Sequence, residues 1–122
     1  MSAGERAGAR RRGAEAEALA ASFLAGRGLE IVARNHRCRF GEIDLVAREG
    51  ATLVFIEVRA RSGSAFGGAA GSVNAAKQRR IVAAARHFLA RVRPEPPCRF
   101  DVLTIQGPGG APDWIRGAFD AA

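Results

Sequence analysis

The fold is decided by the stretch FGEIDLVAREGATLVFIEVR, residues 40–59, in which two apolar segments flank a short polar connection. The segments Phe40 to Arg48 and Thr52 to Arg59 are rich in β-branched and aromatic residues that alternate with polar ones, which is typical of strands. The connection around Glu49-Gly50 is short enough for a tight turn. We therefore expect these segments to form an antiparallel β-hairpin.

Three carboxylates stand inside these apolar strands, Glu42 and Asp44 in the first and Glu57 in the second. Carboxylates are rarely buried without a partner, so their position needs a physical reason. If Arg48 pairs with Leu53 across the turn, Asp44 lies opposite Glu57 on one face of the hairpin. Two neighbouring carboxylates repel each other unless a cation lies between them. The hairpin therefore predicts a site for a hard metal ion.

The metal-ion interpretation assigns Asp44 and Glu57 as ligands, with the backbone carbonyl of Val58 and waters completing the oxygen shell that Mg²⁺ or Mn²⁺ prefers. Such an ion can activate water and neutralise charge on a phosphodiester. The same sequence also allows a plain salt-bridge cluster in which Arg48 and Arg59 pair the acids, and the spacing leaves both alternatives open. The opposite face is expected to be apolar, with Ile43, Leu45, Val54, Ile56 and Val58.

Helices and further strands flank the hairpin. Periodicity and breaker residues predict a helix over residues 14–27, a strand over 29–34, a helix of about twenty residues between Ser72 and Pro94, and strands over 98–105 and 113–116. Residues 1–12 are expected to be a disordered basic tail, and residues 61–71 a flexible Gly-rich loop. The order αβββαββ predicts a single α/β domain over residues 13–122.

Both predicted helices bring polar residues toward the hairpin. Glu17 shares its helix face with Ala20 and Leu24, so it is the acid of the first helix that can face the sheet. Lys77 and Gln78 lie at the start of the second helix, which the loop after the Glu57 strand leads into. For these residues the alternative is a polar side chain at a helix end that extends into solvent.

The net charge of +7, from 19 basic and 12 acidic residues among 122, favours a polyanionic partner, DNA or RNA before an anionic membrane surface. No apolar run is long enough to cross a membrane, and the basic start lacks the apolar stretch of a secretory signal, so we expect a cytoplasmic protein. Cys38 and Cys98 show no metal-binding spacing, so we expect two buried thiols and neither zinc nor a disulfide.

Three other polar residues have simple interpretations. His36, among arginines before the acidic strand, and His87 in the second helix are expected at the surface. Asp101 in the strand RFDVLTI is expected to form an ion pair with Arg99.

The segment NHRCRFGEIDLVAREGATLVFIEVRAR at residues 35–61, followed by Lys77-Gln78 and Arg99-Phe100-Asp101-Val102, resembles the YraN family of small bacterial proteins. That family is assigned to the PD-(D/E)XK nuclease superfamily and is similar to archaeal Holliday-junction resolvases. The resemblance covers roughly residues 13–119 and implies a restriction-endonuclease-like αβββαβ core, a mixed sheet flanked by helices. It also implies that Asp44 and Glu57 are metal carboxylates, with contributions from Glu17, Lys77 and Gln78.

One position departs from the superfamily pattern, because Arg59 stands two residues after Glu57 where Lys is usual. A guanidinium keeps its proton in proteins, so Arg59 is no general base, although it can stabilise phosphate charge. Three functions remain open: a Mg²⁺-dependent DNA endonuclease with branched or single-stranded DNA among its candidate substrates, a nuclease-fold protein that binds nucleic acid without cleaving it, and a protein-interaction module with structural acids. Arginines outside the site are expected to bind phosphates, namely Arg37, Arg39, Arg61, Arg79 and Arg80.

Overall fold

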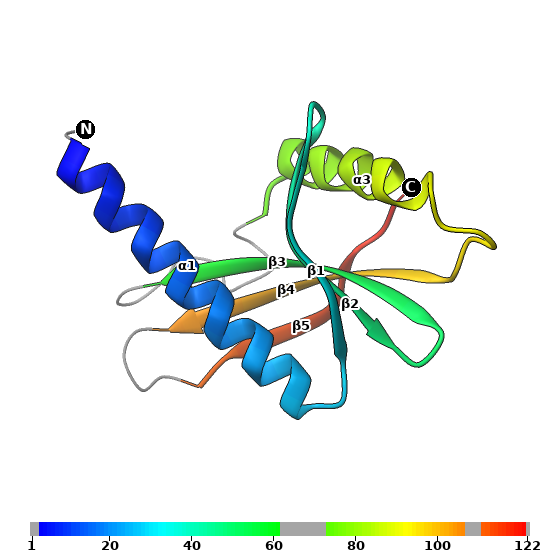
Figure 1. The fold of residues 1–122 in the computed structure, drawn as a ribbon, viewed down its shortest axis with the longest axis horizontal. Helices are drawn as coiled ribbons and strands as arrows, with labels where there is room; N and C mark the ends of the chain where they lie inside the picture. Colours follow the sequence, from blue (N-terminus) through cyan, green and yellow to red (C-terminus); the bar gives the residue numbers. More distant parts are fainter. Residues whose placement is uncertain (1–2, 62–72, 107–110, 122) are drawn as a thin grey trace.

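Five strands form one mixed sheet in the computed structural model, which describes residues 3–61, 73–106 and 111–121, with the backbone alone at residues 3–12 and 61. The elements, shown in Figure 1, are α1 (Ala3–Gly26), β1 (Glu30–Cys38), β2 (Gly41–Glu49), β3 (Thr52–Arg61), α3 (Ala75–Leu89), β4 (Cys98–Gln106) and β5 (Asp113–Phe119). The strands lie side by side in sequence order. This confirms the α/β class and is consistent with a restriction-endonuclease-like core.

The β2/β3 hairpin has the predicted register. Arg48 lies opposite Leu53, and the pairing continues inward to Leu45 opposite Ile56. Beyond this pair, the side chain of Asp44 replaces the backbone as the hydrogen-bond acceptor for β3. Its Oδ2 accepts the backbone N–H of Val58 at 2.8 Å. A carboxylate thus occupies a position where the next pair of strand hydrogen bonds is expected.

The strands β3 and β4 run parallel, while the other neighbouring strands are antiparallel. A parallel pair needs a crossover connection, and α3 lies on it. The side chain of Asn74 caps this helix by accepting the backbone N–H of Lys77 at 2.8 Å. The helix is 15 residues long, shorter than predicted, because it ends at Leu89, well before the first proline, Pro94. Ser72, the expected cap, lies outside the described residues.

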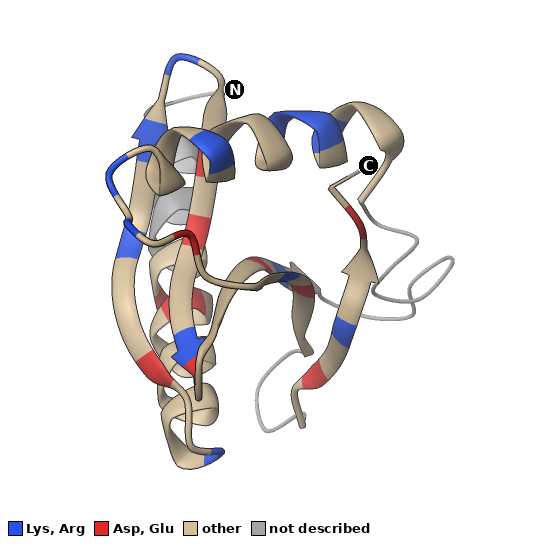
Figure 2. Ribbon diagram, turned by 90° about the vertical axis from the view of Figure 1, so that its right-hand side faces the viewer, with Lys and Arg blue, Asp and Glu red and all other residues tan. Residues whose placement is uncertain are grey.

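The sheet is covered on both faces, which explains why its central strands are apolar on both sides. On one face, α1 contributes Ala16, Ala20, Ala21 and Leu24 to a cluster with Leu45, Val54, Ile56 and Leu103. On the other, α3 contributes Ile81, Ala84, Ala85 and Leu89 to a cluster with Val46, Phe55, Phe100 and Val102. Figures 1 and 2 show the two helices on separate sides of the strands.

One side-chain assignment in the hairpin was wrong. Ile43 packs in the α3 cluster with Val46 and Phe55 instead of with Leu45 and Ile56, as strict alternation predicted. The physical reason is the end of the β2/β3 pairing at Leu45, beyond which β2 pairs with β1 alone. Residues 36–44 of these two strands and their connection thus form a two-stranded ribbon, the β1/β2 ribbon. A two-stranded ribbon twists more strongly than a sheet, and Figure 1 shows this ribbon rising toward α3.

The helix α1 begins at Ala3, earlier than predicted, so it includes most of the stretch that we expected to be an irregular basic tail. Its first turns are rich in Ala, Arg and Glu, which favour helix even where no packing is described. The strand β2 has its predicted length and is shifted by one residue, whereas the other strands are longer than predicted, most of all β1 and β5.

A buried ionic network ties β4 to β5. Asp101 is fully buried and accepts two hydrogen bonds from Arg99, at 2.9 Å each, and others from the indole of Trp114 and the backbone N–H of Gly117. Arg99 also donates to Glu49 at 2.7 Å. The predicted Asp101–Arg99 ion pair is thus confirmed, and Asp101 is a structural residue.

The two cysteines are free thiols, Cys38 half-buried on β1 and Cys98 exposed at the start of β4. The expectation of a buried thiol was therefore wrong for Cys98, because the outermost residue of a strand lacks cover. None of the described helices combines the length and apolar character needed to cross a membrane.

Candidate metal centre

Asp44 and Glu57 line a single pocket of about 180 Å³ between the β1/β2 ribbon, β3 and α3. The residues around it are Gly41, Glu42, Asp44, Glu57, Lys77, Arg80 and Ile81. The register of the hairpin brings the two acids together, as the parity of their positions predicted. The pocket therefore joins carboxylates from two strands with cations from a helix.

Asp44 is held in an unfavourable environment for its charge. Burial raises its pKa from 3.8 to about 8, and the charges of Glu57 and Glu17 add to the rise, while the hydrogen bond from the Val58 amide opposes it. At neutral pH the carboxyl group of Asp44 therefore keeps its proton unless a cation displaces it. Val58 contributes its N–H to this arrangement, whereas the sequence interpretation assigned its carbonyl to the metal.

Glu57 is 5% exposed, and two cations pair with it. The Nζ of Lys77 lies 2.7 Å from its Oε1, and the Nη1 of Arg59 lies 3.6 Å from the same oxygen. The predicted approach of Lys77 to the end of the Glu57 strand is therefore correct. Of the alternative salt-bridge cluster, the Arg59 contact is therefore present, whereas the Arg48 contact is wrong because the Nη1 of Arg48 lies 4.0 Å from the Oε2 of Glu30 instead.

Three acids lie close together beside the pocket, and one of them belongs to α1. Glu17, Glu42 and Asp44 each place a carboxylate oxygen within 4.8 Å of the others, an arrangement able to hold a metal ion. Burial raises the pKa of Glu17 against an opposing hydrogen bond from Asn35, and the charge of Glu42 adds to the rise. Such crowding of like charges is what a divalent cation relieves.

Asn35 has the left-handed backbone conformation, with φ of 52°. Asn tolerates this conformation better than most residues, and strained backbone of this kind is found at binding sites. The turn places its side chain against Glu17. The sequence analysis did not single out Asn35, although an Asn inside a strand is a recognisable signal.

The tip of the β1/β2 ribbon rests directly on α3. A Cβ atom at Gly41 would lie 3.1 Å from the carbonyl oxygen of Arg80, so a side chain here would push the ribbon away from the helix. This contact sets the distance between the acids of β2 and the cations of α3. Glu42 and Gly41 thus belong to the site, although the sequence interpretation gave neither a role in it.

Gln78 does not line the pocket. Its amide donates to the carbonyl of Val73 at 3.0 Å, which secures the segment that leads into α3. Lys77 and Gln78 are neighbours on a helix, so their side chains point about 100° apart, and only one of them can face the acids. The geometry selects Lys77.

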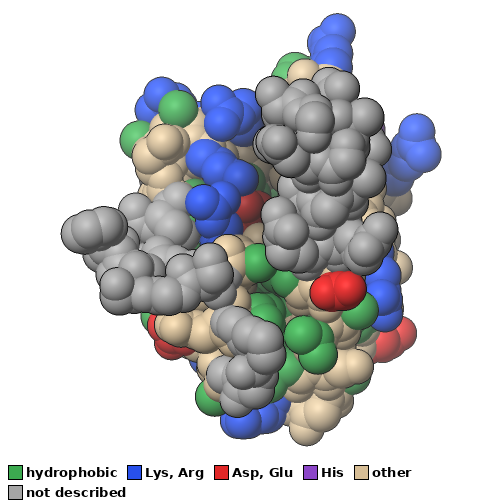
Figure 3. All heavy atoms as spheres, turned by 90° about the vertical axis from the view of Figure 1, so that its left-hand side faces the viewer, with side chains coloured by type: hydrophobic (Ala, Val, Ile, Leu, Met, Phe, Trp, Pro, Cys, Tyr) green, Lys and Arg blue, Asp and Glu red, His purple; other side chains and the backbone are tan. Residues whose placement is uncertain are grey.

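The arginines predicted to bind nucleic acid lie mainly at one end of the molecule. Arg37 and Arg39 are exposed near the ribbon tip, where Arg37 lies 3.5 Å from Glu42 and Arg39 lies over the ring of Phe40. Arg79 and Arg80 are exposed on α3, and Arg80 lines the pocket. Figure 2 shows basic residues on both elements, and Figure 3 shows basic side chains gathered in the upper half of one face, beside an acidic one. The side chain of Arg61 lies outside the described residues.

The chain is similar to a family of known proteins. Residues 16–105 match the description "Uncharacterised protein family UPF0102". The chain belongs to this family. It is 54% identical to a UPF0102 protein of Nitrosospira multiformis, over 91% of this chain and 94% of the relative. Identity to a UPF0102 protein of Cupriavidus taiwanensis is 56%, over 90% and 83%, and to one of Methylobacillus flagellatus 52%, over 89% and 96%.

The UPF0102 match includes the segments that build the pocket. The range 16–105 contains the acids Glu17, Glu42, Asp44 and Glu57 and also Lys77. It is the family to which the sequence resemblance pointed under the name YraN. The names of these UPF0102 relatives state no activity.

Proposed function

We propose that the protein is a divalent-metal-dependent nuclease that cleaves DNA in the acidic pocket and acts in the cytoplasm. The observation that carries the proposal is the convergence of Asp44, Glu42 and Glu17, whose carboxylate oxygens lie within 4.8 Å of one another, beside the Glu57–Lys77 pair. Among the described residues, Arg37 pairs with Glu42 and two cations pair with Glu57, whereas neither Asp44 nor Glu17 has an ion-pair partner. A metal ion between these carboxylates would supply the positive charge that they lack.

The donor set fits Mg²⁺ or Mn²⁺. The pocket offers carboxylate oxygens alone, which hard cations prefer, and it leaves room for waters and a phosphate oxygen. Asp44, Glu57 and Glu17 would hold the ion, with Glu42 as a further ligand. When bound, the ion supplies an activated water and neutralises charge on the phosphodiester.

The cations of α3 and β3 have separate tasks. Lys77 holds the carboxylate of Glu57 at 2.7 Å and has a third of its side chain exposed, so its ammonium group can also donate to a phosphate oxygen. Arg59 lies farther from Glu57, at 3.6 Å, and keeps its proton, so its task is to stabilise charge on the phosphate. Lys77 therefore supplies from the helix the lysine that position 59 lacks.

Membership of the PD-(D/E)XK superfamily is part of the proposal. Support comes from the order Asp44, Glu57, Arg59 on two adjacent strands and from the helix that crosses to the parallel strand β4. DNA as substrate is supported by the net charge of +7 and by the exposed arginines of the ribbon tip and α3, of which Arg80 lines the pocket. Phosphate contacts from these elements would position a strand over the acids.

A second function, binding of nucleic acid without cleavage, is favoured by one observation. Both Lys77 and Arg59 pair with Glu57, so the charge of this acid is already neutralised by side chains of the protein. If that pairing persists with DNA bound, Glu57 is not available to a metal ion. Both functions use the same nucleic-acid-binding surface. They differ only in whether a metal ion binds in the pocket and the DNA is cleaved.

Cleavage assays separate these functions. Duplex, flap, four-way-junction and single-stranded DNA are incubated with Mg²⁺, Mn²⁺ or EDTA, using wild type, Asp44→Asn and the exposed control Asp120→Asn. We expect metal-dependent cleavage of at least one substrate by wild type and the control, and its loss in Asp44→Asn. Binding without cleavage under all conditions supports the second function, and cleavage that persists in Asp44→Asn contradicts the assigned site.

A further inference from the structure

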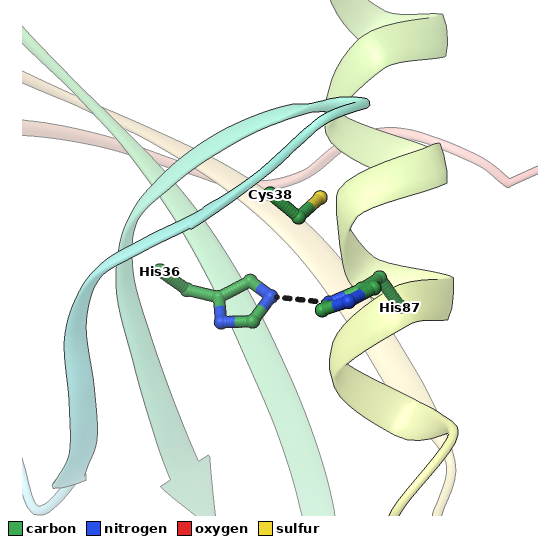
Figure 4. Close-up of side chains that lie close together, drawn as sticks. All are labelled: His36, Cys38 and His87. Atoms are coloured by element: carbon green, nitrogen blue, oxygen red, sulfur yellow. Dashed lines mark hydrogen bonds between the residues drawn. The ribbon is translucent and has the colours of Figure 1, made fainter.

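A second cluster of potential ligands lies outside the acidic pocket, between β1 and α3. His36 and Cys38 on β1 and His87 on α3 each place a ligand atom within 4.8 Å of the other two (Figure 4). Their donors are two imidazole nitrogens and one sulfur, whereas the acidic pocket offers oxygen alone. The two clusters therefore suit different metal ions.

The spacing of the two imidazoles matches a shared metal ion. The Nε2 of His36 lies 3.2 Å from the Nδ1 of His87, where a single proton joins them. In a tetrahedral zinc site with Zn–N bonds of about 2.0–2.1 Å, two nitrogen ligands lie roughly 3.3 Å apart. A zinc ion can thus replace the shared proton at nearly the same distance between the nitrogens, with each ring turning so that its lone pair faces the ion.

The three side chains are held in place by the fold. His36 and Cys38 are two residues apart on a strand, so they point to the same face, which looks toward α3. The ring of His36 packs edge-on against Phe88, with centroids 5.2 Å apart, and the ring of His87 lies 6.5 Å from that of Phe40. Aromatic contacts of this kind reduce the freedom that metal binding would otherwise have to remove.

We propose that His36, Cys38 and His87 form a binding site for Zn²⁺ or another borderline-soft transition metal ion. Three protein ligands leave a fourth position for water, the pattern of an open zinc site. Metal binding removes the thiol proton of Cys38, so the sulfur becomes the thiolate that zinc prefers. The proposal revises the expectation of no zinc, which rested on the absence of a local Cys/His motif.

The metal ion would link the β1/β2 ribbon to the last turn of α3. The same ribbon carries Gly41, Glu42 and Asp44 into the acidic pocket, and its tip rests on Arg80. Zinc would therefore hold the acids of β2 at a constant distance from the cations of α3. This positioning effect is separate from the proposed nuclease function and stands whether or not the pocket cleaves DNA.

The experiment is a Co²⁺ titration of the full chain, reduced and without a histidine tag, followed by displacement with Zn²⁺. We expect one high-affinity ion per chain, with the absorption of a thiolate-to-cobalt bond and of four-coordinate cobalt. Cys38→Ser should abolish the thiolate absorption. His87→Ala should weaken affinity by more than about a hundredfold, because even groups that only support a ligand are worth ten- to a hundredfold.

Matched controls exclude the other cysteine and the other cluster. Cys98→Ser removes the exposed thiol and should bind Co²⁺ as wild type does, and Mg²⁺ in excess throughout the titration keeps Co²⁺ out of the acidic pocket. Circular dichroism checks that each variant is folded, and Cys38→Ala and His87→Gln replace any variant that is not. Absence of binding, or thiolate absorption that survives Cys38→Ser, overturns the proposal and leaves a histidine pair joined only by a hydrogen bond.

Discussion

Replacement of Asp44 by Asn tests the electrostatic state of the pocket. The pKa of Asp44 is raised from 3.8 to about 8 by burial and by the charges of Glu57 and Glu17, so the folded protein holds a proton that the unfolded chain has lost. Between these two values, the free energy of unfolding falls as pH rises, by about 1.4 kcal/mol per pH unit. The stability contributed by the neutral carboxyl group is fully present below pH 3.8 and is lost as pH approaches 8.

The size of the effect follows from this slope. Between pH 5 and pH 7, wild type loses about 3 kcal/mol through Asp44. Asn cannot ionise, and its amide oxygen still accepts the Val58 N–H, so Asp44→Asn should lack this loss. The variant is therefore expected to be more stable than wild type at pH 7 in EDTA, although it lacks the proposed metal ligand.

Urea unfolding at several pH values, with EDTA or Mg²⁺, measures both effects. Mg²⁺ at ten times its dissociation constant should stabilise wild type by about 1.4 kcal/mol and leave Asp44→Asn unchanged. Glu15→Gln, an exposed change on α1, is the control for loss of a charge. Parallel pH profiles for wild type and Asp44→Asn, or equal stabilisation of both by Mg²⁺, would refute the reasoning.

Three other predictions follow from the same geometry. Lys77→Met should lower DNA cleavage about a hundredfold in a single-turnover assay, because it removes a charge stabiliser from the pocket, whereas Arg59→Lys should retain or raise it. A rate for Lys77→Met equal to that of wild type would contradict its role. Asp101→Asn should lower the free energy of unfolding by about 2–3 kcal/mol in urea, since an amide nitrogen replaces one carboxylate oxygen and leaves two donors without their acceptor, and an effect below about 1 kcal/mol would show that the network is dispensable. Arg80→Ala should reduce by about one the slope of log affinity for DNA against log salt, whereas Arg27→Ala, at the far end of α1, should leave that slope unchanged.

Local patterns were enough to predict the elements and the hairpin register. A short connection and a side-chain period of two favour a pairing in which Arg48 lies opposite Leu53, or one that is shifted by two residues and keeps the same faces, and the first of these pairings is present. Periodicity likewise predicted the order of helices and strands. Their ends were less well predicted, as in α3, because the residue that caps a helix is chosen by local hydrogen bonds.

Which residues form the site depends on contacts between elements that are distant in the sequence, and local sequence patterns do not predict such contacts. Lys77 and Gln78 are neighbours at the start of α3, so the sequence does not show which of them contacts Glu57. Only Lys77 does, because the rotation of α3 about its own axis decides which residue faces the acids. Glu42 joins Glu17 and Asp44 because the β1/β2 ribbon twists after its pairing with β3 has ended. The same twist moves Ile43 to the α3 cluster.

The sequence by itself determined the sheet, the hairpin acids and the excess of positive charge, because periodicity, turn length and composition are local properties of the chain. Only the tertiary structure decided which distant groups meet. His36 and His87 are separated by 51 residues and lie 3.2 Å apart because the ribbon and α3 pack against each other. A metal site assembled from a strand and a helix has no sequence spacing of its own, since the packing of the elements sets the distance between its ligands.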